Sequence, residues 1–164
     1  MDCNFLLPEG RFNFRVGGLF LYEGRLLAMR DKGFDFWYLP GGRVRLHETM
    51  GQALCREAGE ELGAEARIIR PLWLCESFFS LGGEAIHELC MYFLAELDWE
   101  KLPSLTGPFR LADSDGQEHC FAWLTEEQVH GESIYPLVMQ ENWPCLPESL
   151  TLITDQRDRA AKPC

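Results

Sequence analysis

The fold is decided by the stretch GRVRLHETMGQALCREAGEELGA, which occupies Gly42–Ala64. Its second half, Thr49–Leu62, predicts a helix. Thr49 is a suitable N-cap, and Gln52 stands three residues further on, as a capping box requires. Gly63 can end the helix, because glycine adopts the left-handed conformation of a C-cap without strain. The stretch therefore predicts a loop followed by a helix whose faces can be assigned.

The predicted helix carries three glutamates on one narrow stripe. At about 100° per residue, Glu60 and Glu61 lie on either side of Glu57. Like charges at this spacing destabilise a helix, and Arg56 is the only basic residue inside it. The acids border the buried face, because the adjoining stripe is apolar and consists of Leu54, Ala58 and Leu62. Such a cluster predicts a bound cation, and its all-oxygen donors favour Mg²⁺ or Mn²⁺. A solvated acidic face is the alternative.

The segment before the helix supports a metal site. Leu39-Pro40-Gly41-Gly42 predicts a tight turn whose glycines leave backbone groups accessible. Glu48, directly before the N-cap, can fold back towards the glutamate stripe. The turn is not a P-loop, since no Gly-Lys-Ser/Thr follows, and the Asp/Asn ladder of an EF-hand is absent. A glycine turn leading into an acid-rich helix indicates a site for a metal-bridged oxyanion.

The rest of the chain alternates between strands and helices. Strands are predicted over residues 12–22, 25–30, 36–39, 66–79, 85–97 and 118–124. Residues 98–116 contain two prolines and are predicted to form a surface loop. A short helix is predicted after Thr125 and another over residues 136–143, and a frayed tail from Arg157. Because hairpins dominate this order, it favours an α/β fold with a mixed sheet over a doubly wound one.

The composition excludes several classes of protein. The chain has 164 residues, 46% of them hydrophobic, which suits one folded domain and not a disordered chain. Its net charge of -11 argues against a nucleic acid polymer or an anionic membrane as partner, because both select basic surfaces. No apolar run approaches a membrane span, and no secretory signal is recognised. With seven scattered cysteines and no C-x-x-C pair, we expect a cytoplasmic protein with reduced thiols.

Residues 42–64 resemble the Nudix box of MutT-like hydrolases, Gly-x5-Glu-x7-Arg-Glu-U-x-Glu-Glu-x-Gly-U, where U is aliphatic. Every fixed position is filled, by Gly42, Glu48, Arg56, Glu57, Glu60, Glu61 and Gly63. The two U positions hold Ala58 and Ala64, which are smaller than usual. The resemblance implies a Nudix fold, a mixed β-sheet sandwiched between helices (an α/β/α sandwich). We expect a single domain over residues 1–164, with a core of about 12–130 and a helical C-terminal extension of about 131–156.

The resemblance also implies a reaction. Metal-activated water would hydrolyse a diphosphate bond in a small nucleoside diphosphate-linked or nucleoside triphosphate substrate. Carried over by position, the ligands of Mg²⁺ or Mn²⁺ would be Glu57, Glu60 and Glu61, joined by the Gly42 carbonyl. Glu48 would either bind the metal directly or support the ligands by hydrogen bonds. The alternative is a catalytically inactive Nudix-fold module that binds nucleotides or regulates.

The same resemblance implies roles in catalysis. Glu57, Arg56 and Glu60 form the expected catalytic set, with Glu57 as first candidate for the general base. Arg56 would orient the glutamates through charge-assisted hydrogen bonds. Some Nudix enzymes take a further ligand or base from a later loop, and Glu118 is the candidate here, with an ordinary loop glutamate as the alternative.

Residues outside the box give weaker indications of how a substrate is held. Arg30 ends a predicted strand where related enzymes often contact a phosphate, and a solvated charge at the strand end is the alternative. Trp37 lies in an aromatic run that offers a stacking surface for a base, although core packing is the alternative for most of Phe34, Phe36, Trp37 and Tyr38. Three polar residues interrupt apolar strands, namely Glu76, His87 and Glu88. They are candidates for lining the cleft, and residues with satisfied partners or at an exposed edge are the alternative. The expected partner is a small nucleotide-type substrate, and a homodimer is left open.

Overall fold

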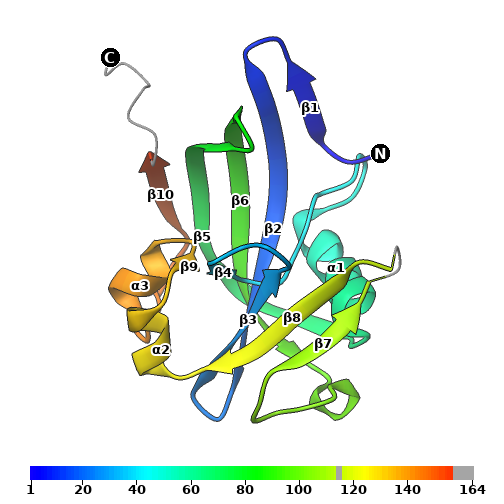
Figure 1. Cartoon of the computed structure of the whole chain (residues 1–164), viewed down its shortest axis with the longest axis vertical. Coiled ribbons are helices and arrows are strands. Elements are labelled where there is room, and N and C mark those ends of the chain that lie inside the picture. The colour runs from blue at the N-terminus through cyan, green and yellow to red at the C-terminus, as the bar shows by residue number, and fades with distance from the viewer. Residues whose placement is uncertain (114–115, 157–164) are drawn as a thin grey trace.

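The computed structural model of the chain describes residues 1–113 and 116–156 (Figure 1). Strands make up most of it: β1 Asn4–Leu7, β2 Gly10–Tyr22, β3 Arg25–Asp31, β4 Trp37–Tyr38, β5 Ala66–Leu81, β6 Glu84–Leu97, β7 Phe109–Ala112, β8 Glu118–Leu124, β9 Ile134–Tyr135 and β10 Thr151–Gln156. The helices are α1 Met50–Leu62, α2 Glu126–Gly131, α3 Val138–Asn142 and the 3₁₀ turn η1 Trp99–Lys101. Among the described residues, no helix has the length and apolar character needed to cross a membrane.

The strands form two walls that share β2. In the first wall the order is β10-β5-β6-β2, and residues 11–20 of β2 run parallel to residues 86–95 of β6. In the second wall β3 pairs antiparallel with β8, while the short strands β4 and β7 extend it. The far end of β2 crosses into this second wall, where Leu21 and Tyr22 pair with β3. The mixed sheet with helices on both sides confirms the predicted Nudix architecture.

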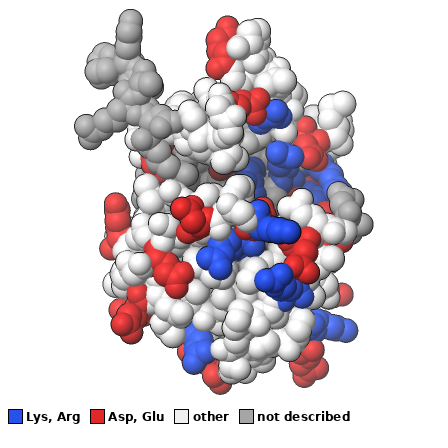
Figure 2. All heavy atoms as spheres, viewed as in Figure 1, with Lys and Arg blue, Asp and Glu red and all other residues white. Residues whose placement is uncertain are grey.

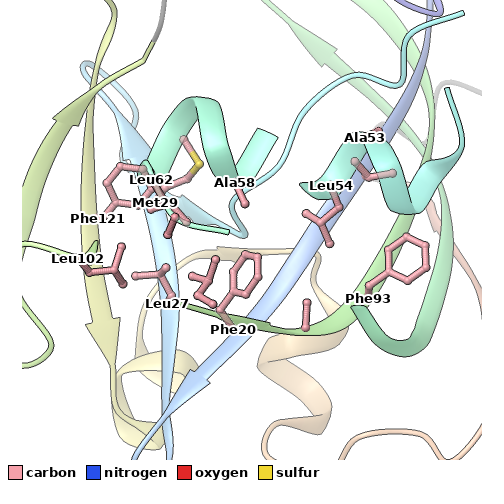
Figure 3. Close-up of a cluster of buried hydrophobic side chains, with 14 of the residues drawn as sticks. Phe20, Leu27, Met29, Ala53, Leu54, Ala58, Leu62, Phe93, Leu102 and Phe121 are labelled. Carbon is pink, nitrogen blue, oxygen red and sulfur yellow. The ribbon is translucent and has the colours of Figure 1, made fainter. Parts of the chain in front are cut away.

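Two hydrophobic clusters hold the helices against the sheet. Helix α1 contributes Leu54 and Leu62 to a cluster that also contains Phe20, Met29 and Phe121 (Figure 3). The second cluster lies under α2 and α3 and contains their fully buried residues, Val129 and Met139. Each large side chain buried in this way contributes about 1.5–3 kcal/mol.

Helix α1 begins and ends as the sequence predicts. The Thr49 hydroxyl accepts from the Gln52 backbone N–H at 3.3 Å, and Gln52 Oε1 accepts from the Thr49 N–H at 2.9 Å. This reciprocal capping box satisfies two amide donors that a helix start otherwise leaves unpaired. Gly63 lies in the left-handed region at φ 64°, and its N–H donates to the Gly59 carbonyl. The caps fix the rotation of α1 and thereby the direction of its glutamates.

Elsewhere the sequence prediction is wrong in part. The predicted loop 98–116 contains β7, which pairs with β8 in a hairpin. The C-terminal extension 131–156 is only partly helical, since it also contains β9 and β10. Strand β10 pairs in parallel with residues 73–78 of β5 at the edge of the first wall. Strand β1 was not anticipated either, and the predicted fraying of the tail from Arg157 lies outside the described residues. Short edge strands of this kind are fixed by a partner distant in sequence rather than by a local pattern.

Candidate active site

One guanidinium organises the glutamates around α1. Arg56 Nε and Nη2 donate to the two oxygens of Glu48 at 2.8 and 3.0 Å. Its Nη1 donates to Glu57 Oε1 at 2.7 Å and to Glu60 Oε2 at 2.9 Å. Three carboxylates are therefore held by one side chain, as the sequence analysis expects for Arg56. Such charge-assisted bonds are shorter and stronger than neutral ones.

The loop before α1 closes against the same guanidinium. Arg56 Nη2 also donates to the Arg43 carbonyl at 2.9 Å, and Glu48 accepts from the Arg45 N–H at 2.9 Å. The Arg45 side chain lies 3.3 Å from Glu60. Hydrogen bonds from the Arg56 side chain hold the pKa of Glu48 below its usual range. Glu48 is thus an anion that fixes the loop to the helix.

Glu61 and Glu57 are less well compensated. Glu61 is 9% exposed and accepts from the Gly41 N–H at 3.1 Å. Burial, with the charge of Glu57 adding to it, raises the pKa of Glu61 to about 8. Burial also raises the pKa of Glu57, although the hydrogen bond from Arg56 opposes that shift. The buried end of the acid stripe lacks positive charge.

Two glycines allow the loop to approach these carboxylates. A Cβ at Gly42 would lie 2.3 Å from the carboxyl carbon of Glu57, so any side chain there would displace it. Gly41 has φ 147°, and a Cβ there would lie 2.2 Å from the Val16 carbonyl oxygen. The Gly42 carbonyl, a predicted metal ligand, accepts from the Val16 N–H at 2.9 Å, which leaves one lone pair of that oxygen.

The residues present fit a hard divalent cation. The donors are carboxylate and carbonyl oxygens, and a cation beside Glu57 and Glu61 would supply the missing positive charge. A preformed cage is not present, because no group of three His, Cys, Asp or Glu side chains in residues 1–113 and 116–156 converges on one point. Glu48 and Glu60 point instead to Arg56 and Arg45. Cation binding would therefore require those two side chains to turn.

A cleft of about 660 Å³ lies between the two walls and reaches the acid cluster through Arg15. Arg15 Nη2 lies 3.5 Å from the carbonyl oxygen of Gly41. The backbone N–H of the same glycine donates to Glu61. The first wall supplies a polar floor that includes Asn13 and Glu88. The second wall supplies aromatic rings, which are Phe34, Phe36, Tyr38 and Tyr135. Figure 2 shows basic side chains gathered around a hollow on an otherwise mixed surface.

Two predicted substrate contacts lie outside this cleft. The Arg30 guanidinium stands 4.3 Å above the ring of Trp37, and the indole N–H of Trp37 donates to Glu132. Trp37 belongs to the hydrophobic cluster under α2 and α3. Neither residue lines the cleft, because alternation along β4 directs Trp37 away from the side on which Phe36 and Tyr38 lie. Of the aromatic run, Phe34, Phe36 and Tyr38 are the residues that offer a stacking surface.

The three polar interruptions of β5 and β6 divide between the two faces. Glu88 lines the cleft, as predicted. His87, its neighbour in sequence, points to the opposite face, where its Nε2 lies 3.0 Å from Glu76 and its ring stacks on Phe78. Glu76 and His87 are thus partners of each other and do not line the cleft.

Glu118 does not join the acid cluster. Its carboxylate is 61% exposed and accepts from Arg110 at 2.7 Å across the β7–β8 hairpin. The next residue, His119, is buried and bonds to Asp31, which does line the cleft. The structure therefore favours the ordinary surface glutamate over a metal ligand at this position.

Three residues that line the cleft were not predicted from the sequence, namely Arg15, Asn13 and Asp31. Arg15 and Asn13 stand on the side of β2 opposite to Phe14 and Val16, so their alternation was a usable signal. Asp31 accepts a hydrogen bond from Tyr38, and burial together with this neighbour raises the pKa of Tyr38. Which of these residues face the chemistry depends on the pairing of distant strands, which a local pattern does not give.

Comparison with known proteins identifies the family of this chain. The model of the NUDIX domain matches residues 12–145. A relative from Haloferax volcanii, the low-salt glycan biosynthesis protein Agl8, is 35% identical over 85 residues, which are 48% of this chain and 54% of that protein. The chain spans about half the length of the curated relatives that it matches.

Solved structures show the same fold. A NUDIX hydrolase from Nitrosomonas europaea has a TM-score of 0.58 at 18% identity, covering 88% of this chain and 79% of that one. An ADP-ribose pyrophosphatase from Streptococcus suis has a TM-score of 0.56 at 12% identity, covering 87% and 98%. With its complete box, its sheet between helices and a domain match over residues 12–145, the chain belongs to the Nudix hydrolase family.

Proposed function

We propose that the protein is a metal-dependent hydrolase of a diphosphate bond in a small nucleoside diphosphate-linked or nucleoside triphosphate substrate. One observation carries this proposal. The buried carboxylate of Glu61 and the half-buried one of Glu57 have raised pKa values and lie behind the Gly41 loop. Arg15 contacts the other side of this loop and lines a cleft with an aromatic wall. Such a site suits a ligand with phosphates at one end and a ring at the other.

The proposed metal ligands are the carboxylates of α1 and its loop. Glu57, Glu60 and Glu61 would hold Mg²⁺ or Mn²⁺, with Glu48 and the Gly42 carbonyl as further donors. When bound there, such a cation neutralises diphosphate oxygens and lowers the pKa of an attacking water. Glu118 is not among the proposed ligands, because it pairs with Arg110.

The chain's own residues would do the rest. Glu57 is the proposed general base, and burial raises its pKa towards the range in which a carboxylate accepts a proton more readily. Arg43 lines the cleft and can hold non-bridging phosphate oxygens. Arg56 is a positioning residue, since its contacts are to glutamates and to the Arg43 carbonyl. The rings of Phe34 and Phe36 are stacked with their centroids 4.9 Å apart, and they offer a face on which the flat ring of a base can stack.

The test is product release from a panel of nucleoside triphosphates and nucleotide sugars, with Mg²⁺ and with Mn²⁺. We expect turnover that requires the metal and is lost in the double variant Glu57→Gln, Glu60→Gln. The matched control replaces two exposed glutamates of α2, Glu126→Gln and Glu127→Gln, and should keep full activity. Turnover that survives in the Glu57/Glu60 variant would refute the mechanism. Nucleotide binding without turnover across the panel would favour the inactive binding module instead.

A further inference from the structure

Two buried acceptors lie side by side on the cleft floor. Asn13 on β2 and Glu88 on β6 are register partners in the parallel pairing of these strands. Both line the cleft, and they are only 6% and 9% exposed. Adjacent parallel strands are about 4.8 Å apart, so the two side chains lie close enough to contact one ligand group.

Neither acceptor has a hydrogen-bond donor within the part of the chain that the structure describes. Asn13 Oδ1 is buried and has no partner. The Glu88 carboxylate has an ion pair with Arg15 at 3.9 Å, which is too long for a hydrogen bond. Buried polar atoms in folded proteins are nearly always hydrogen-bonded, and an unpaired one is costly. Asn13 Oδ1 is such an exception among the described residues, and the Glu88 carboxylate beside it has only the distant Arg15. Because both line a ligand-sized cleft, we infer that a ligand supplies the donors.

The aromatic wall opposite the floor favours a flat ring in the cleft, so the donors are best sought among adjacent N–H groups on one edge of a base. Among the common nucleobases, guanine alone presents two neighbouring donors, its N1–H and its 2-amino group, with a carbonyl beside them. A carboxylate accepts such a pair in a bidentate manner. Adenine and cytosine place a ring acceptor next to their amino group, and uracil places its single N–H between two carbonyls. An acceptor facing Glu88 would be repelled.

We propose that Asn13 and Glu88 select guanine as the base of the substrate, by accepting hydrogen bonds from its N1–H and 2-amino groups. Arg15 provides a donor next to these acceptors, which suits the guanine carbonyl. The rings of Phe34 and Phe36 on the opposite wall provide a stacking surface. This inference rests on the proposed function, because the same cleft receives the substrate.

The first experiment measures binding of GDP, IDP and ADP by titration of the whole chain in the presence of Mg²⁺. A site that hydrogen-bonds a ligand discriminates strongly against an analogue that lacks the donor. We therefore expect GDP to bind at least about tenfold tighter than ADP, and IDP to lie between them because hypoxanthine lacks the 2-amino group. Equal affinity for the three nucleotides would overturn the proposal.

Variants then assign the selectivity to these two residues. In Glu88→Gln one acceptor becomes a donor, and the GDP-to-ADP ratio should fall to near one. The matched control is Glu76→Gln on the neighbouring strand, whose side chain bonds His87 on the opposite face and should leave the ratio unchanged. Asn13→Leu removes the unpaired acceptor, so we expect it to lower the ratio without lowering the melting temperature. If either variant at the floor folds and keeps the full ratio, the assignment is wrong.

Kinetics separate this inference from the proposed hydrolysis. For GTP, Glu88→Gln should raise KM with little change in kcat, since Glu88 would contact the base and not the reacting phosphorus. Equal turnover of GTP and ATP, lost in the Glu57→Gln, Glu60→Gln variant, would uphold the hydrolase and overturn the guanine site. Guanine-selective binding without any turnover would uphold the guanine site and overturn the hydrolase.

Discussion

Helix α1 and strand β6 both carry buried carboxylates, yet the protein treats them differently. Glu57 and Glu60 on the helix share one guanidinium with Glu48 of the preceding loop, and its four hydrogen bonds to them measure 3.0 Å or less. On the strand, Glu88 has an arginine no closer than 3.9 Å. Beside it lies Asn13 of β2, whose side-chain oxygen has no hydrogen-bond partner among the described residues. At the helix end, the carboxylates are already hydrogen-bonded to the arginine that they share. At the strand end, the acceptor oxygens are available to a ligand.

This difference between the two ends of the site indicates what a ligand has to supply at each of them. The acid cluster has enough hydrogen bonds but too little positive charge, as the raised pKa of Glu61 indicates. A cation corrects that deficit. On the cleft floor, no residue that the structure describes donates a hydrogen bond to the side-chain oxygens of Asn13 or Glu88, and a neutral base can supply those donors. Phosphates next to the metal and a base on the floor would satisfy both ends with one molecule.

The largest effect should come from the helix end. Glu57→Gln keeps the shape of the side chain but removes its charge and its ability to accept a proton. Because a general base contributes about 10²–10⁴ to the rate, we expect kcat to fall by about 10³-fold. Steady-state rates against Glu126→Gln as control would check this. A fall below tenfold would remove Glu57 from its proposed role.

A glycine pair separates the geometry of the acid cluster from helix stability. Gly42→Ala would push a methyl group against the Glu57 carboxyl, and a displacement on the order of 1 Å can cost about 10²-fold in rate. Gly59→Ala, in the same family motif, meets no atom within 4 Å and should stabilise α1 by about 0.5–1 kcal/mol with activity unchanged. Similar kinetic losses in both variants would contradict the close approach seen here.

Removing the shared guanidinium should destabilise the fold. Arg56→Met leaves three carboxylates without their donor, and breaking a mostly buried ion pair in this way costs about 3 kcal/mol. Urea unfolding would measure the loss, which added Mg²⁺ should partly restore. Arg110→Met is the control, because the exposed pair of Arg110 with Glu118 is worth less than about 1 kcal/mol. Equal losses would show that the cluster is not a network.

The raised pKa of Glu61 predicts how stability depends on pH. In the unfolded chain its carboxyl titrates near 4.5, whereas the folded protein holds the proton up to about 8. Between these values the folded state binds more protons than the unfolded state, so stability falls as pH rises through this window. Metal-free melting temperatures on either side of the window would show the fall, and Glu61→Gln should flatten it. Mg²⁺ should stabilise most at the alkaline end; a protein that becomes more stable with rising pH would contradict the prediction.

The smallest effect belongs to the cleft floor. Asn13→Leu removes an acceptor that has no donor, so the ligand-free protein should be unchanged or gain up to about 1 kcal/mol. Thermal unfolding without ligand is the measurement. A clear loss of stability would mean that Asn13 has a structural partner, and the contrast between the two ends of the site would weaken.

A feature of this molecule could be predicted from the sequence when its residues are close together along the chain, and could not when they come from distant segments. The acid cluster was predictable because Arg56, Glu57 and Glu60 are neighbours on one helix, and the helix repeat sets their directions. Trp37 and His87, both candidate substrate contacts, lie outside the cleft, and their faces depend on strand pairing. The Asn13–Glu88 neighbourhood arises only when β2 lies parallel to β6, a contact between distant segments that no local pattern encodes.

Strand β2 contributes backbone to both walls of the cleft, pairing first with β6 and then with β3. Both walls are therefore connected by one continuous peptide, and the twist of that strand sets the distance between them. In the middle of β2, the ring of Tyr92 from the neighbouring strand packs against Gly17 so closely that a Cβ there would lie 2.5 Å from it. This close packing leaves no room for β2 to bend at Gly17 as a hinge between the walls. Ligand association should accordingly be a single kinetic step, with an observed rate that rises linearly with nucleotide concentration.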